Sequence, residues 1–193
     1  MTQTRKIAVI VGSLRKESLN RKAALALARL APPGVELEIV EIGDLPLYDE
    51  DIEAAGVPGP WARFRDEIKA SDAVLFVTPE YNRSVPGALK NAIDVGSRPY
   101  GASAFAGKPA AVMSLSQGAI GGFGANHHLR QSLVFLGMPV LQQPEAYVGG
   151  AGALFGANGD ITDDGTRDFF RTFIEAFAAW MEQNSEPQVA SGR

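Results

Sequence analysis

Hydrogen-bond donors and a cation gather in residues 12–20, whose sequence is GSLRKESLN. This segment follows a strongly apolar run and leads into helical spacing, so we predict a turn from a strand into a helix. The free N–H groups at a helix N-terminus form an anion site. Ser13, Ser18 and Asn20 add neutral donors, and Arg15 adds a cation that can hold two phosphate oxygens. We therefore predict a phosphate site; the simpler alternative is that Ser18 only caps the helix and Arg15 is solvated.

Two better-known phosphate loops do not match the chain. Residues 12–20 lack the GxGxxG pattern of a Rossmann dinucleotide site, and they also lack the Walker A pattern. A later Gly107-Lys108 pair precedes Pro109, where a P-loop needs a hydroxyl. That pair is predicted to be a turn into a strand.

A second loop, residues 79–87 (PEYNRSVPG), carries two prolines and an aromatic side chain. The prolines stiffen the backbone, so its N–H and C=O groups are held in fixed positions. Tyr81 offers an aromatic face beside them. Such a surface suits a planar heteroaromatic ligand. On spacing alone, an ordinary capped turn is an equal alternative.

A third loop, residues 116–122 (SQGAIGG), contains three glycines. Glycine lets the backbone approach a ligand closely, and the loop amides can point toward developing negative charge. Taken alone, this loop is best interpreted as an ordinary flexible connection. Three loops of this kind in one chain favour a shared ligand site.

Apolar runs without alternation predict the buried strands that position these loops. Three runs are of this kind, at residues 6–11, 73–77 and 109–115. Residues 35–39 (VELEI) alternate apolar and acidic side chains, which predicts an edge strand with one face in water. Residues 138–141 (MPVL) are predicted as a fifth strand, with Pro139 near its start.

Helical spacing of apolar residues separates the strands. Four stripes show it, at residues 19–30, 85–93, 129–136 and 170–180, and a shorter helix is predicted at residues 61–70. The alternation of strand and helix predicts a doubly wound parallel α/β sheet. Ligands bind to such sheets beyond the carboxyl ends of the strands, which is where the three loops are expected.

The composition is that of a globular protein, with 46% hydrophobic residues, 21% charged residues and a formal net charge of −4. We predict one domain over residues 1–185 and a disordered tail over residues 186–193, which show no pattern. No basic stripe, long apolar run or signal peptide stands out. We therefore expect a cytoplasmic protein that binds neither nucleic acid nor membrane.

The chain contains no cysteine, which excludes disulfides, thiolate catalysis and cysteine metal sites. Its two histidines, His127 and His128, are adjacent. Neighbours on a helix point about 100° apart, so this pair does not chelate one metal. We predict no metal site, and any redox chemistry must use an organic cofactor.

Together the three loops resemble those of the NADPH-dependent FMN reductase family of the flavodoxin-like fold, near its chromate and quinone reductase branch. Four segments carry the resemblance: GSLRKESLNRK, LPLYDED, TPEYNRSVPGALKNAIDVGSR and GAIGGFGANHHLRQSL. The resemblance extends over nearly the whole chain, from the first strand to the last helix. The string that begins PEYN is the most specific part.

This resemblance implies a three-layer sandwich around a five-stranded parallel sheet of order 2-1-3-4-5, which agrees with an edge strand at residues 35–39. It implies that FMN binds non-covalently and that NADPH or NADH is the electron donor. The implied acceptors are small molecules such as quinones, chromate, azo compounds or free flavin. Family members are typically homodimers or homotetramers that use helices such as residues 85–95 at the interface.

The family also implies roles for individual residues. The FMN phosphate is implied to bind Ser13, Arg15, Ser18 and Asn20. The isoalloxazine ring is implied to lie beside Pro79, Glu80, Tyr81 and Asn82, with Ser116 and Gly118 approaching it from the third loop. No side chain is assigned as a catalytic acid or base.

The chain departs from its relatives at three positions. Gly124 stands where many relatives carry arginine, Asn126 where they carry glutamine, and Val95 where tryptophan is common. Other functions stay open at this point: a flavodoxin-type electron carrier, a nucleotide-binding sensor, or a hydrolase that uses Ser13 with one of the two histidines.

Overall fold

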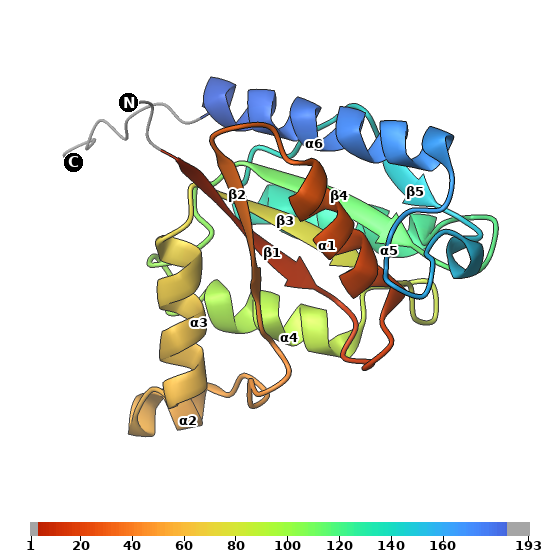
Figure 1. Ribbon diagram of the computed structural model, residues 1–193. Coiled ribbons are helices and arrows are strands. Elements are labelled where there is room, and N and C mark those ends of the chain that lie inside the picture. The colour runs from red at the N-terminus through yellow and green to blue at the C-terminus, as the bar shows by residue number, and fades with distance from the viewer. Residues whose placement is uncertain (1–3, 185–193) are drawn as a thin grey trace.

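The computed structural model describes residues 4–184, and one parallel sheet runs through its centre (Figure 1). Its strands are β1 (Arg5–Val11), β2 (Val35–Val40), β3 (Ala73–Thr78), β4 (Ala110–Leu115) and β5 (Ala146–Val148). They lie in the order β2-β1-β3-β4-β5, and every pairing is parallel. This is the flavodoxin-like arrangement that the resemblance implied. The predicted tail, residues 186–193, lies outside the described residues.

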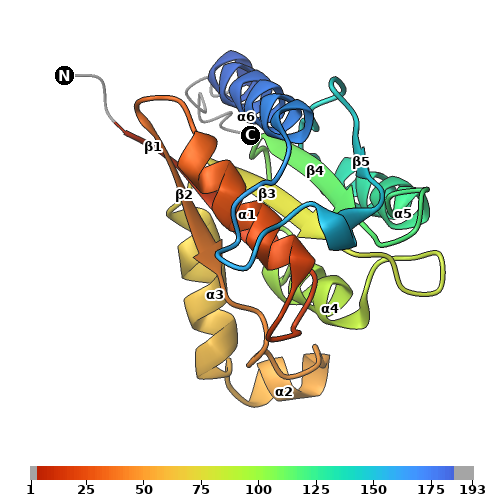
Figure 2. The same cartoon turned by 45° about the vertical axis from the view of Figure 1, so that its right-hand side comes forward.

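Helices cover both faces of the sheet (Figures 1 and 2). One face is covered by α1 (Leu19–Leu30) and α6 (Asp164–Asn184), and the other by α3 (Gly59–Lys69), α4 (Gly87–Gly96) and α5 (Phe123–Phe135). A short helix, α2 (Glu50–Ala55), precedes α3, and a 3₁₀ turn, η1 (Ala151–Ala153), follows β5. The fold is therefore a three-layer sandwich.

The burial of the strands follows their sequence patterns. The residues of β3 and β4 are all buried, as expected for runs without alternation. In β2, Glu36 and Glu38 are exposed while the apolar residues between them turn inward, so the predicted edge strand is confirmed. Among the described residues, no helix combines the length and hydropathy needed to cross a bilayer.

The fifth strand does not lie at residues 138–141, and that prediction was wrong. Val140 forms only an isolated parallel bridge to Ala110, and the regular ladder on β4 resumes at Ala146–Val148. Pro139 and Pro144 lack the N–H group that a continuous ladder requires. The sheet edge is therefore divided into a single bridge and a short strand.

Strand register brings the predicted loops to one edge of the sheet. The carboxyl ends of the strands are aligned through three neighbouring pairs, Val11 with Val77, Thr78 with Ser114, and Leu115 with Val148. The first loop follows β1, the second follows β3 and the third follows β4. These strands are neighbours in the sheet, so the three loops are neighbours as well.

Candidate functional site

The first and second loops are in close contact where they leave β1 and β3. The N–H group of Gly12 donates to the carbonyl oxygen of Val77 at 2.9 Å. A Cβ atom on Gly12 would lie 2.7 Å from Oγ1 of Thr78 and 3.3 Å from Cδ of Pro79. Only glycine allows this approach, so Gly12 sets the distance between the two loops.

The second and third loops are also joined. A Cβ atom on Gly122 would lie 3.7 Å from Cβ of Glu80. The N–H group of Ala125, just after the third loop, donates to Oε2 of Glu80 at 3.1 Å. The three loops therefore form one continuous surface along the carboxyl edge of the sheet.

The first loop presents a row of unused donors. The backbone N–H groups of residues 13–17, 19 and 20 have no acceptor within residues 4–184. Ser18 caps α1, because its Oγ accepts from the N–H group of Arg21 at 3.1 Å. Asn20 is only 5% exposed, and its Oδ1 atom accepts no hydrogen bond from the described residues. Free donors and an unsatisfied buried oxygen are what a polar ligand would satisfy.

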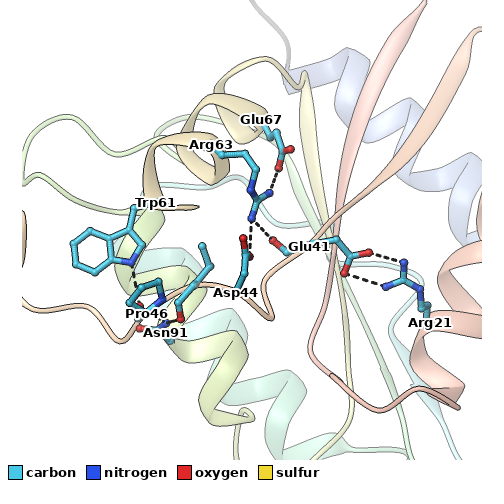
Figure 3. Close-up of polar contacts among 9 residues, drawn as sticks. Arg21, Glu41, Asp44, Pro46, Trp61, Arg63, Glu67 and Asn91 are labelled. Carbon is cyan, nitrogen blue, oxygen red and sulfur yellow. Dashed lines mark hydrogen bonds and ion pairs between the residues drawn. The ribbon is translucent and has the colours of Figure 1, made fainter. Parts of the chain in front are cut away.

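The charge around the first loop is positive. Arg15 and Lys16 are exposed, and neither forms an ion pair within the described part of the chain. Arg21 instead pairs with Glu41 through two hydrogen bonds of 3.1 and 2.5 Å (Figure 3), and hydrogen bonding from Arg21 lowers the pKa of the Glu41 carboxyl. A cavity of about 420 Å³ lies beside these residues, between the first loop and the end of β2. The site is therefore suited to an anion.

Two of the family segments, LPLYDED and the one that contains Asn91, are hydrogen-bonded to each other. The Pro46 carbonyl oxygen accepts from Nε1 of Trp61 and from Nδ2 of Asn91, both at 3.0 Å (Figure 3). Oδ1 of Asn91 accepts from the N–H group of Tyr48 at 2.8 Å. Asn91, from the LKNAID string, thus holds the LPLYDED segment in place, a role that sequence reasoning missed.

The second loop contains a tight turn. Tyr81 and Ser84 exchange two backbone hydrogen bonds, of 3.1 and 2.9 Å, across Asn82 and Arg83. These two central residues have φ of 51° and 63°, in the left-handed region. The turn leaves Tyr81 and Asn82 exposed. Pro79 and Glu80, which precede them, are largely buried.

The third loop offers a second row of donors. The backbone N–H groups of residues 117–120 find no acceptor among residues 4–184. The Ser116 hydroxyl donates to the carbonyl oxygen of Gly118 at 3.0 Å, which shapes the loop from within. Gly149, which directly follows β5, packs closely against the loop, since a Cβ atom there would lie 2.5 Å from the Ala119 carbonyl oxygen.

The two histidines bind different partners. Nε2 of His127 lies 3.0 Å from the hydroxyl of Tyr147, and Nδ1 of His128 lies 2.9 Å from Oγ of Ser84. Neither histidine hydrogen-bonds Ser13 in the described part of the chain. The nucleophile and base of a hydrolase are therefore not assembled. No group of three or more histidine and acidic residues capable of holding a metal occurs within residues 4–184.

Tyr147, which lies against Gly121 of the third loop, has a raised pKa. Burial, together with its hydrogen bond to Glu145, raises the pKa of Tyr147 to about 12. An unfolded tyrosine titrates near 10, so the folded protein loses stability as pH rises from about 10 to about 12. In a pH titration followed by the ultraviolet absorbance of phenolate, we expect an ionisation step at high pH that Tyr147→Phe removes. A variant with the same ionisation step would show that another tyrosine causes it.

Two departures from the relatives have structural explanations. Asn126 is fully buried, and its Nδ2 atom faces the Ser114 hydroxyl and the Ala146 carbonyl oxygen, both at 3.3 Å. A Cβ atom on Gly124 would lie only 2.7 Å from the carbonyl oxygen of Arg83. An arginine at position 124 would therefore require the second loop to move. Sequence reasoning noted both positions but gave neither a role.

The donor set fits FMN. The first loop supplies N–H groups and a cation for a phosphate, and a buried oxygen of Asn20 that a ribityl hydroxyl can satisfy. The second and third loops supply an aromatic side chain and free amides for a flat polar ring. All ten residues that sequence analysis nominated lie on these loops or on the first turn of α1. Their contacts with a ligand stay a prediction.

Comparison with known proteins agrees with this chemistry. Residues 5–153 match the family described as NADPH-dependent FMN reductase. The chain is 67% identical over 184 residues to a quinone reductase of Pseudomonas putida, covering 95% of this chain and 98% of that protein. It is 46% identical over 176 residues to a 2-hydroxy-1,4-benzoquinone reductase of a Burkholderia species, covering 91% and 96%.

A solved structure shows the same fold at substantial identity. It is the flavoenzyme NAD(P)H:(acceptor) oxidoreductase of Paracoccus denitrificans, which is 44% identical to this chain. The two superpose with a TM-score of 0.88, over 93% of this chain and 98% of the other.

Proposed function

The chain belongs to the NADPH-dependent FMN reductase family, and from this we propose that its three loops hold FMN for the reduction of quinones. The protein is an oxidoreductase that uses FMN and NAD(P)H. The observation that carries the proposed location is the pair of donor rows, in residues 13–20 and 117–120, which follow β1 and β4 on either side of β3 at one edge of the sheet. We include a cytoplasmic location in the proposal, because NAD(P)H is supplied there.

We propose that each loop holds a different part of the cofactor. Ser13, Arg15, Ser18 and Asn20 bind the phosphate end. Pro79, Glu80, Tyr81 and Asn82 border the ring, and Ser116 and Gly118 approach it from the other side. Support comes from the free N–H groups of the first loop, its unpaired cations, and the tight turn that exposes Tyr81 and Asn82.

Bound FMN would supply the redox chemistry, taking hydride from NAD(P)H and passing electrons to the acceptor. The protein contributes position and electrostatics. The free amides of residues 117–120 would stabilise negative charge on the ring edge that they face. Chromate, azo compounds and free flavin are candidate acceptors beside quinones.

The direct test is the visible spectrum of the purified protein. We expect a yellow protein that bleaches when NADPH or NADH is added without oxygen, and whose colour returns when a quinone is added. Initial rates against both substrates should give parallel lines, because donor and acceptor use the same face in turn. A colourless protein that takes up no FMN would contradict the proposal, and bleaching without turnover would favour an electron carrier.

Arg15→Ala is expected to weaken FMN binding about ten- to hundred-fold, because charge-assisted hydrogen bonds contribute roughly 1.5–3 kcal/mol. The dissociation constant can be measured from the quenching of flavin fluorescence. Lys16→Ala is the matched control, since this neighbouring cation is also exposed and unpaired but has no assigned contact. Equal effects of both changes would mean that only the general positive field matters, and no effect would remove Arg15 from the site.

We further propose that the enzyme is a homodimer or homotetramer. A cavity of about 550 Å³ lies between α4 and α5. Phe135, at the end of α5, is 78% exposed beside it, and Val134 is exposed next to it. A second copy that covers this face would bury both side chains. The molar mass in solution, measured by light scattering, tests the proposal, and a monomer would contradict it.

A further inference from the structure

The N-terminus of α5 has no cap of its own. Its N-cap residue is Gly122, which has a φ of 77° and no side chain to accept a hydrogen bond. The acceptor comes instead from the second loop, where Oε2 of Glu80 accepts from the N–H group of Ala125 at 3.1 Å. The Glu80 side chain is only 12% exposed. A carboxylate in this place satisfies an unpaired donor and complements the helix dipole.

The same carboxylate also binds within its own loop. Oε1 of Glu80 accepts from the guanidinium of Arg83 at 3.2 Å. Arg83 and Asn82 occupy the left-handed region, which non-glycine residues adopt only when surrounding contacts hold them there. Because the Arg83 side chain is 73% exposed, the ion pair adds little by itself. The bond from Glu80 to the helix is the stronger of the two restraints.

The turn of the second loop sits directly on the first turn of α5. A Cβ atom on Gly124 would lie 2.7 Å from the Arg83 carbonyl oxygen and 2.9 Å from Oε2 of Glu80. One turn later, Nδ1 of His128 lies 2.9 Å from Oγ of Ser84. The second loop is therefore fastened along the start of α5, and the third loop leads directly into that same helix.

We propose that Glu80 is a positioning residue, which fixes the second loop against α5 and so sets the spacing between the second and third loops. This inference rests on the proposed function, in which those two loops border the FMN ring. Glu80 then acts through Asn82 and the third-loop amides, and it needs no contact with the ring. Its carboxylate is already occupied on both oxygens.

The test compares three replacements of Glu80. Glu80→Gln keeps the length and an oxygen acceptor for Ala125, so FMN affinity should stay within about three-fold of wild type. Glu80→Asp keeps the charge but is too short to reach the helix, and Glu80→Ala removes the acceptor. Both should weaken FMN binding about ten-fold or more, and the visible circular dichroism of the bound flavin should change. Flavin fluorescence gives the dissociation constants.

A helix cap elsewhere provides the control. Asp163 accepts from the N–H group of Thr166 at 2.9 Å at the start of α6, in the opposite layer. Asp163→Ala should lower stability without changing FMN affinity, because that helix does not carry the three loops. Equal affinity in folded Glu80→Asp and wild type would overturn the positioning role while leaving the proposed function intact. If Glu80→Ala fails to fold, the comparison of Glu80→Asp with Glu80→Gln tests the positioning role. A wild-type protein that binds no FMN would overturn both the positioning role and the proposed function.

Discussion

Gly121→Ala is expected to lower the free energy of unfolding by about 3 kcal/mol or more and to abolish FMN retention. Gly121 has a φ of 64°, which costs alanine roughly 1–2 kcal/mol. Its added Cβ would lie 2.5 Å from the carbonyl carbon of Tyr147 and 2.7 Å from the nitrogen of Val148. These are backbone atoms of β5, so they cannot rotate away, and overpacking adds about 1–3 kcal/mol. Urea denaturation measures the loss.

Two other glycines separate the cost of the positive φ from the cost of the contact with β5. Gly137 has a φ of 69° but nothing within 4 Å of an added Cβ, so Gly137→Ala carries only the conformational cost of roughly 1–2 kcal/mol. Gly118 has one neighbour, Oγ of Ser116 at 3.8 Å, so Gly118→Ala should leave stability unchanged. If Gly121→Ala is no less stable than Gly137→Ala, the contact with β5 is not rigid. Gly118→Ala should still lower FMN affinity, because the added methyl group would enter the space proposed for the FMN ring.

The layers of the fold and the place of the site were predictable because they depend on local patterns. Unbroken apolar runs predicted β1, β3 and β4, and the alternation of Glu36 and Glu38 with apolar neighbours predicted the edge strand β2. Adjacent parallel strands must end at one edge, so the three loops had to meet there. The strand order came from the family resemblance, and the sheet confirms it.

What was missed depends on partners far apart in the sequence. Residues 138–141 and 146–148 are both short apolar candidates, and only their hydrogen bonds to β4 decide between them. Glu80 and Ala125 are 45 positions apart, and no local signal connects an acidic loop residue to a helix whose N-cap residue is glycine. Even a known family string did not reveal that Glu80 caps α5, because motifs record residue types and not their contacts.

Asn126→Leu is expected to lower the free energy of unfolding by about 2–3 kcal/mol, because the buried Asn126 amide loses its hydrogen bonds and the Arg130 donor is left without an acceptor. The Nδ2 atom of Asn126 faces the Ser114 hydroxyl and the Ala146 carbonyl oxygen, and Oδ1 accepts from Nε of Arg130 at 2.9 Å. Leucine has the same number of side-chain heavy atoms, branched at the same position, but offers no polar atom. Chemical denaturation of wild type and variant gives the difference.

A double-mutant cycle with Arg130 tests whether the loss comes from this hydrogen bond. Arg130→Leu removes the donor that Asn126→Leu leaves unpaired, so the double variant should be more stable than the sum of the single losses by about 1 kcal/mol or more. Purely additive losses would mean that Asn126 acts through packing alone. FMN affinity should fall with stability in Asn126→Leu, because Asn126 joins α5 to β4 and β5. The same first turn of α5 receives Glu80 and follows the third loop, so a helix that shifts on the sheet moves two sides of the cofactor site together.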